Sequence, residues 1–264
     1  MVVRVPGALV GWMPLFLLVL MRLTGLFLAA PFWSSRMFPP AVKASLCLFL
    51  ALVLLPTVDG SRVPTAAVPL ALAAVGELAW GALAGFAASL CFAAVQMAGY
   101  YLDFELGVGI ANVVDPTFGA PVPVAGTFLY LLSLVVFLGA NGHHLLLGAL
   151  VRSLQAIPPG SAVLSPAAAR GMVAQAGVMF VLGLELAAPL VLPMFLANLA
   201  LGLVSRTVPQ LNVFVVGLPL KTWVGVLFLA LALPAYVTAF GGWQEKVAEA
   251  LVRVMAVAPG SGVP

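Results

Sequence analysis

Long apolar runs separated by short polar breaks make up most of the chain. A helix of about 20 apolar residues spans the hydrocarbon core of a bilayer, which is about 30 Å thick. Most of the runs reach this length, and a segment of mixed polarity follows the last one. The pattern therefore predicts an all-α integral membrane protein, a single membrane domain over residues 1–264, with apolar segments at 10–30, 42–55, 70–101, 122–150, 173–203 and 213–240 and a short amphipathic tail at 241–255.

Two of these runs do not fit a simple membrane-spanning helix. The run at 42–55 has only about 14 residues, a length that fits a tilted, re-entrant or protein-buried helix better than an independent span. In the run at 70–101, Gly81 and Gly85 have the four-residue spacing that lets two helices approach closely. A chain rich in Ala and Gly also produces this spacing by chance, so both interpretations of the glycines stay open.

The composition agrees with a membrane protein and disfavours several functions. Of the 264 residues, 64% are apolar and 7% are charged, whereas a soluble domain has about 25% charged residues. The net charge of +3 comes from scattered Lys and Arg residues. The sequence has no run of basic residues that could bind along a phosphate backbone, so nucleic acid is a poor candidate partner. Cys47 and Cys91 lie singly in apolar runs and make no disulfide framework.

Few residues suggest catalysis or a bound cofactor. His143 and His144 are adjacent, so on a helix their side chains point about 100° apart and do not easily share one metal ion. Gly107 and Gly109 are not followed by the third glycine of a dinucleotide-binding loop, and the sequence has no P-loop. We therefore predict no catalytic residue, no metal site, no cofactor and no enzyme activity.

The ionisable residues inside apolar segments include Arg22, Glu77 and Glu185. Such residues mark ion or substrate pathways by default, because a charge is costly within a membrane. The alternative is that each carboxylate pairs with a basic side chain, such as Arg22, Arg206 or Lys221, or lies at a wet interface and holds helices together. We favour this alternative, and a proton relay or transport site stays open.

A polar break between the last two apolar segments has an unusual composition for its position. Residues 205–214 include Arg206, Gln210 and Asn212, whose side chains are costly in lipid. They also include Pro209, which lacks a backbone donor. We expect this corner to lie at an interface, in a buried junction between helices or against another subunit.

Several motifs resemble the FliR/SctT family of type III export-apparatus components, which includes flagellar and injectisome proteins. The most specific is the polar break together with Gly-Leu-Pro-Leu-Lys at 217–221, which looks more flagellar than injectisome-like. The other matching stretches, in order along nearly the whole chain, are Arg22–Phe27, Ala30–Phe32 with Arg36 and Pro39, Gly76–Leu78 with Gly81 and Gly85, Gly107–Pro116, Asn141–His143 and Ile157–Pro158.

The resemblance implies a role in protein export. Family members form, with FliP and FliQ, the core of the gate through which unfolded flagellar subunits leave the cell, and they are not enzymes. The implied partners are FliP-like and FliQ-like proteins, FlhB-like and FlhA-like export components, the exported subunits and membrane lipid. The implied location is the cell inner membrane at the flagellar basal body. Tilted helical hairpins within the complex are also implied, which agrees with the short second segment.

The loop after the third apolar segment acquires a role from the same resemblance. In the family this loop projects into the channel and helps to plug it, and the matching residues are about 110–121. Apolar side chains exclude water from a narrow channel, and glycines permit close packing. We therefore predict that part of the closed gate is formed by Ile110, Val113, Val114 and Phe118. The alternative is an ordinary packed connector.

The resemblance also gives the polar corner a purpose. It implies that Arg206, Gln210 and Asn212 form hydrogen bonds within the core complex and that Pro209 sets the bend between the last two helices. Other functions stay open beside the flagellar one. They are an injectisome export component, a structural scaffold, and an ion-coupled small-molecule transporter that uses Glu77 or Glu185.

Overall fold

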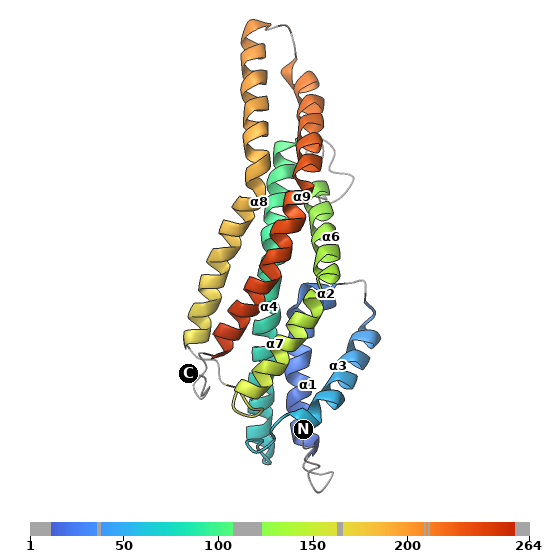
Figure 1. Ribbon diagram of the computed structural model, residues 1–264, viewed down its shortest axis with the longest axis vertical. Coiled ribbons are helices and arrows are strands. Elements are labelled where there is room, and N and C mark those ends of the chain that lie inside the picture. The colour runs from blue at the N-terminus through green and yellow to red at the C-terminus, as the bar shows by residue number, and fades with distance from the viewer. Residues whose placement is uncertain are drawn as a thin grey trace. The chain divides into compact units, whose positions relative to one another are not determined.

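The computed structural model consists of helices and connecting turns, without strands, over the residues that it describes: 12–35, 38–107, 123–162, 166–208, 210 and 212–256. The all-α prediction is therefore confirmed. In chain order the elements are α1 (Trp12–Ala29), α2 (Pro31–Ser34), α3 (Pro40–Leu54), the short 3-10 helix η2 (Leu55–Thr57), α4 (Ala67–Glu105), α6 (Val124–Gly139), α7 (Gly142–Ala156), α8 (Pro166–Thr207) and α9 (Val213–Ala256) (Figure 1).

Several of the helices are long and apolar, as expected of an all-α membrane protein. Within the described residues, five helices are long and apolar enough to cross a membrane, or six if α6 and α7 count as one broken span. The break falls inside the run predicted at 122–150, where Asn141 has a φ of 57°. Asn adopts this left-handed conformation more readily than most residues. The chain is a membrane protein with five or six candidate spans.

Three helices are longer than the bilayer core is thick. α4, α8 and α9 contain 39, 42 and 44 residues, which correspond to about 58 to 66 Å at about 1.5 Å per residue. α9 continues without interruption through 241–255, so this segment is helical but is not a separate helix. Its place at the membrane surface stays a prediction.

The helices form two compact units. Unit 1 comprises residues 1–90, 141–177 and 244–264, and unit 2 comprises residues 91–140 and 178–243. The three long helices contribute residues to both units. The single membrane domain expected from the sequence stays a prediction.

A close crossing of α1 and α4 builds unit 1. A Cβ atom added at Gly81 would overlap the backbone carbonyl of Arg22, and one added at Gly25 would overlap that of Leu78. Gly85 meets the α1 backbone one turn further along. Small residues are needed where two helix backbones approach this closely. Of the two interpretations of these glycines, close helix packing is the one that the structure shows.

α3 covers α1 on another side of unit 1 (Figure 1). Among its residues, Cys47 and Ala51 are buried. Large apolar side chains such as Phe49 and Leu52 are 62% and 58% exposed. This helix therefore uses a narrow stripe to pack against its own chain and presents the rest of its surface to lipid or to other proteins.

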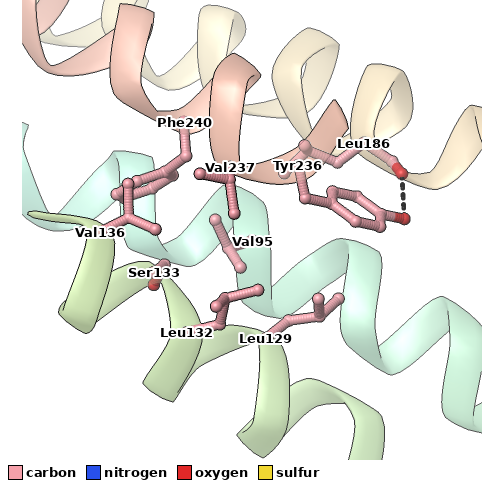
Figure 2. A pocket seen from close by; sticks show the side chains of 9 residues that line it. All are labelled: Val95, Leu129, Leu132, Ser133, Val136, Leu186, Tyr236, Val237 and Phe240. Carbon is pink, nitrogen blue, oxygen red and sulfur yellow. Dashed lines mark hydrogen bonds between the residues drawn. The ribbon is translucent and has the colours of Figure 1, made fainter. Parts of the chain in front are cut away.

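Aromatic rings form the centre of unit 2. The ring of Phe92 on α4 makes edge contacts with Phe137 of α6 and Phe240 of α9, with ring centroids 5.5 and 5.4 Å apart. Aromatic pairs favour this geometry. Beside them, the Tyr236 hydroxyl of α9 donates a 2.6 Å hydrogen bond to the Leu186 carbonyl of α8 (Figure 2). The cavity in Figure 2 has a volume of about 20 Å³, which holds about one water molecule and is too small for a larger ligand.

Candidate functional site

Arg22 and Glu77 form a buried ion pair that connects α1 to α4. Their side chains are 1% and 0% exposed, and Arg22 Nε donates a hydrogen bond to Glu77 Oε2. An unpaired charge at such a position is very costly. Of the alternatives considered for Glu77, pairing with a basic side chain is the one that the structure shows.

Further hydrogen bonds extend this pair to α7 and to the turn after it. Arg22 Nη1 donates to Ser153 Oγ at 3.2 Å, and Nη2 donates to the Ile157 carbonyl at 3.1 Å. The Gly160 amide donates to Glu77 Oε1 at 2.9 Å, and Gly160 has a φ of 93° that favours glycine. A buried ion pair requires such additional bonds to offset its desolvation. We call these five residues the clasp of unit 1.

Glu185 has a different environment from Glu77. It lies on the part of α8 that belongs to unit 2, it is exposed, and it has no hydrogen-bond or ion-pair partner within the described ranges. Four residues later, Pro189 lies inside the helix and has no N–H, so the backbone carbonyl of Glu185 also lacks its usual helical donor. Within the described residues, the Glu185 carboxylate is therefore exposed and unpaired, unlike that of Glu77.

A groove on unit 2 runs between α4 and α8. It has a volume of about 460 Å³ and is lined by Tyr101, Glu105, Leu184, Ala188, Val191, Leu192, Phe195 and Asn198. The groove is polar where Asn198 Nδ2 donates a 3.1 Å hydrogen bond to Glu105 Oε2. Tyr101 also forms a hydrogen bond with Glu105. The remaining described lining is apolar, and it includes no basic side chain.

A buried carboxylate joins the helices on the two sides of the predicted gate segment. Asp103, near the end of α4, is 6% exposed. Its Oδ1 accepts from the Ala125 amide at 2.9 Å and its Oδ2 accepts from the Gly126 amide at 3.0 Å, in the first turn of α6. These amides have no partner within their own helix, so the carboxylate acts as an N-terminal cap from a distance. A Cβ at Gly99 would overlap Gly126, so close contact requires glycine there.

The contacts of Asp103 concern the helices beside the predicted gate and not the gate residues. Ile110, Val113, Val114 and Phe118 lie outside the described residues. The gate therefore stays a prediction, although the helices that flank it are held together by Asp103.

The polar corner is described in part. Arg206 is exposed in the last turn of α8 and has no partner within the described part of the chain. Gln210 and Asn212 are also exposed, and the Asn212 carbonyl accepts from the Val215 amide at 3.0 Å, at the start of α9. Pro209 lies outside the described residues. The role of the corner in assembly stays a prediction.

The similarity to known proteins covers almost the whole chain. The profile of the family described as "Bacterial export proteins, family 1" matches residues 13–247. The chain belongs to this family. The flagellar biosynthetic protein FliR of Bacillus subtilis is 38% identical over 84% of this chain and 87% of its own length, and that of Escherichia coli is 33% identical over 85% and 86%. The Yop proteins translocation protein T of Yersinia pestis is 29% identical over 82% and 84%.

The sequence did not predict two of the polar contacts. In both, the partner is a backbone group or a residue far away in the sequence. Asp103 follows an apolar run, and its partners are backbone amides 22 and 23 positions away. Ser153 resembles any small polar residue of a helix, and only its position opposite Arg22 gives it a role. No local pattern identifies either contact.

Within the described ranges, the chain has no cluster of metal ligands. No group of three or more His, Cys, Asp or Glu side chains lies close enough together to hold a metal ion there. The rings of His143 and His144 have centroids 4.1 Å apart.

Proposed function

We propose that the chain is the FliR-type component of the flagellar type III protein-export apparatus. With FliP-like and FliQ-like proteins it forms the channel through which unfolded flagellar subunits leave the cell. The observation that carries this proposal is the extent of the family match, because residues 13–247 include the clasp, the groove and the polar corner. The flagellar relatives from Bacillus subtilis and Escherichia coli support the flagellar assignment.

The lengths of the apolar helices support a place inside a larger assembly. A helix tilted by about 40°, the upper end of the usual range, crosses the bilayer core with about 26 residues. The apolar helices Ala67–Glu105 and Ala168–Thr207 have 39 and 40 residues. Leu72 on α4 and Phe180 on α8 are among the exposed large apolar side chains, at 70% and 57%. Lipid covers only part of such helices, so we assign the rest of their surface to neighbouring protein.

The proposal places this membrane protein in the cell inner membrane, at the flagellar basal body. It gives the chain no enzymatic step, because its contribution is to form and close a channel. FlhB-like and FlhA-like export components are proposed as further neighbours. Within the channel, Ile110, Val113, Val114 and Phe118 are proposed to form part of the closed gate. Replacing these four residues by Ser should raise small-ion leak through the assembled complex, and unchanged conductance contradicts the gate.

The polar corner is proposed as an assembly determinant. Arg206 is exposed without a partner in the described part of the chain, and Gln210 and Asn212 lie beside it in sequence. The Arg206→Ala chain should insert into the membrane at the normal level but be recovered poorly with its partners. Normal recovery of the complete complex from this variant contradicts the role of the corner.

An affinity purification tests the whole proposal. The tagged chain is extracted from membranes of its own cell in mild detergent, and the proteins that accompany it are identified. FliP-like and FliQ-like proteins are expected in stoichiometric amounts, and deletion of the chain should abolish motility and the secretion of flagellar subunits. Recovery of the chain without these proteins, from cells in which they are made, overturns the proposal.

A second candidate is an injectisome export component. Its support is the Yersinia pestis relative, which aligns over 82% of the chain. Deletion separates the two candidates, because an injectisome component leaves motility intact. An ion-coupled transporter has less support, since Glu77 already binds Arg22 and Gly160 through its two carboxylate oxygens.

A further inference from the structure

We propose that the groove between α4 and α8 of unit 2 receives an apolar helix from another membrane subunit of the export apparatus, and that a basic side chain of this helix pairs with Glu185. The partner's membership of the apparatus rests on the function proposed above. The groove and its charges stand on the structure alone. Lipid and a second copy of this chain are the competing occupants.

The groove has the length and openness of a seat for a helix. Its lining extends along α8 from Leu184 to Asn198, which is about 21 Å at about 1.5 Å per residue. The side chains of Leu184, Leu192 and Phe195 are 67%, 64% and 60% exposed. Apolar side chains spaced by three or four residues on one helix form the ridges and grooves into which a second helix packs. This surface therefore has the form of an unfilled helix-packing site.

The charge around the groove is negative. Glu105 lies in its polar part, where the described donors to it are neutral groups of Asn198 and Tyr101. Glu185 follows Leu184 directly and lies three residues before Ala188 on the helix, so it projects near the edge of the lining. Among the residues that the structure describes, no basic side chain lines the groove. The occupant that complements this surface carries a positive charge.

Lipid complements the surface poorly. Acyl chains cover the apolar lining but leave the Glu185 carboxylate without a donor, and anionic headgroups repel it. An arginine presents five N–H donors in a planar fork, two of which can bind a carboxylate in parallel. A helix that carries Arg, or Lys, at this position therefore fits better than lipid.

The spacing of the polar groups along α8 restricts the partner further. Glu185 and Asn198 are 13 positions apart in the sequence, which corresponds to about 20 Å along the helix. A partner helix that runs along the groove is therefore expected to carry its basic residue opposite Glu185 and a hydrogen-bonding residue about 13 or 14 positions away, opposite the Glu105–Asn198 pair. The residues between these two positions are expected to be apolar.

Site-specific photo-crosslinking in intact membranes tests the occupant. A photoreactive amino acid replaces Leu192 in the groove, in cells that make the complete apparatus, and the crosslinked peptide is identified by mass spectrometry. The expected product joins Leu192 to an apolar helix of a different membrane protein that contains Arg or Lys within about two helical turns of the crosslink. The matched control is Leu196, which is 53% exposed on the same helix but does not line the groove; its crosslinks should not depend on Glu185.

Charge reversal then tests the pairing. Glu185→Arg should lower the Leu192 crosslink at least about tenfold, because truncation or reversal of a desolvated charge pair costs more than the 1.4 kcal/mol that corresponds to a factor of ten. Replacement of the partner's basic residue by Glu should restore the crosslink in the Glu185→Arg chain. Since Glu185 has no partner within the described residues, this substitution should leave the amount of inserted chain unchanged.

Four results overturn the assignment of the groove. They are a lipid adduct at Leu192, a crosslink to a second copy of this chain, a partner peptide without a basic residue, and an undiminished crosslink in the Glu185→Arg variant. Recovery of FliP-like and FliQ-like proteins with the unaltered chain is measured in parallel. When these proteins are recovered and the groove gives one of the four results, the groove assignment alone fails. When they are absent, the proposed function fails.

Discussion

Glu77 in unit 1 and Glu185 in unit 2 both interrupt long apolar helices, but their partners differ. Glu77 is fully buried and receives hydrogen bonds from Arg22 and from the Gly160 amide. Glu185 is exposed and has no partner among the residues that the structure describes. A carboxylate in an apolar run is therefore used for the fold when a neighbouring helix supplies a donor, and it is available to a partner when none does. Whether a carboxylate is paired within the chain therefore depends on the neighbouring helices and turns, and not on the apolar segment that contains it.

The largest effect is expected from Glu77→Leu. This change leaves the Arg22 guanidinium buried without its carboxylate, and breaking a buried pair in this way costs about 3–5 kcal/mol. Glu185→Leu is the matched control, because it removes a carboxylate of the same type that has no partner in the described chain. Thermal unfolding of the purified chain in detergent should show a large loss for the first variant and almost none for the second. Similar losses of stability in both variants contradict the conclusion that only Glu77 is paired within the chain.

A double replacement, Arg22→Met with Glu77→Leu, distinguishes lost charge pairing from lost packing. Apolar replacement of a complete buried pair is often close to neutral. The Ile157 carbonyl and the Gly160 amide would remain without partners, at about 1–3 kcal/mol for each buried group. The double variant should therefore recover part of the stability that Glu77→Leu loses. A double variant less stable than Glu77→Leu argues against charge pairing as the main term.

A smaller effect is expected where α1 crosses α4. Gly81→Ala places a Cβ against the Arg22 carbonyl, and overpacking of this kind costs about 1–3 kcal/mol. Gly148→Ala is the control in the same unit, because an added Cβ there meets no atom within 4 Å. It should stabilise α7 by about 0.5–1 kcal/mol, since alanine favours helix over glycine. Chemical unfolding of both variants measures the difference, and equal stabilities exclude a close crossing.

In unit 2, Asp103→Asn should have a moderate and local effect. Asn keeps the size of the side chain but replaces one accepting oxygen by a donor, so one of the two bonds to the start of α6 is lost. Loss of a helix cap costs about 0.5–2 kcal/mol. Hydrogen exchange at the Ala125 and Gly126 amides should become faster, while exchange within unit 1 stays the same. Unchanged exchange at both amides means that the carboxylate does not cap this helix.

The smallest effect is expected from Tyr236→Phe. It removes only the hydroxyl that donates to the Leu186 carbonyl, and one such hydrogen bond contributes about 0.5–1.5 kcal/mol. The aromatic ring and its packing are retained. The unfolding midpoint of the variant should fall slightly, and a loss as large as that of Glu77→Leu contradicts a contribution of this one hydrogen bond alone.

Hydrophobic pattern predicted an all-α membrane protein but not every helix boundary. The break at Asn141 lies inside an apolar run, so polarity alone does not indicate it. α9 extends to Ala256 because Glu, Lys, Ala and Arg of the charged tail are good helix formers, so loss of hydrophobicity does not end the helix. A pattern based on polarity indicates which residues can lie in the membrane, but it does not indicate where the helix ends.

Long-range polar contacts were harder to predict. Pairing of Glu77 was anticipated from the cost of an unpaired charge, and Arg22 was one of the available bases. The sequence could not indicate that Ser153 and the Ile157 carbonyl, 131 and 135 positions from Arg22, would complete the clasp. Such contacts depend on how the chain returns to α1, and that information is not present in any local pattern.

The link from Asp103 to the start of α6 also affects how the chain tolerates change. Because the carboxylate fixes both ends of the segment that lies between Asp103 and Ala125, that segment is a closed loop in the thermodynamic sense. The entropy of closing a flexible loop grows only with the logarithm of its length, by about 0.6 kcal/mol for each doubling. Insertions and deletions between these two residues should therefore leave the stability of unit 2 nearly unchanged.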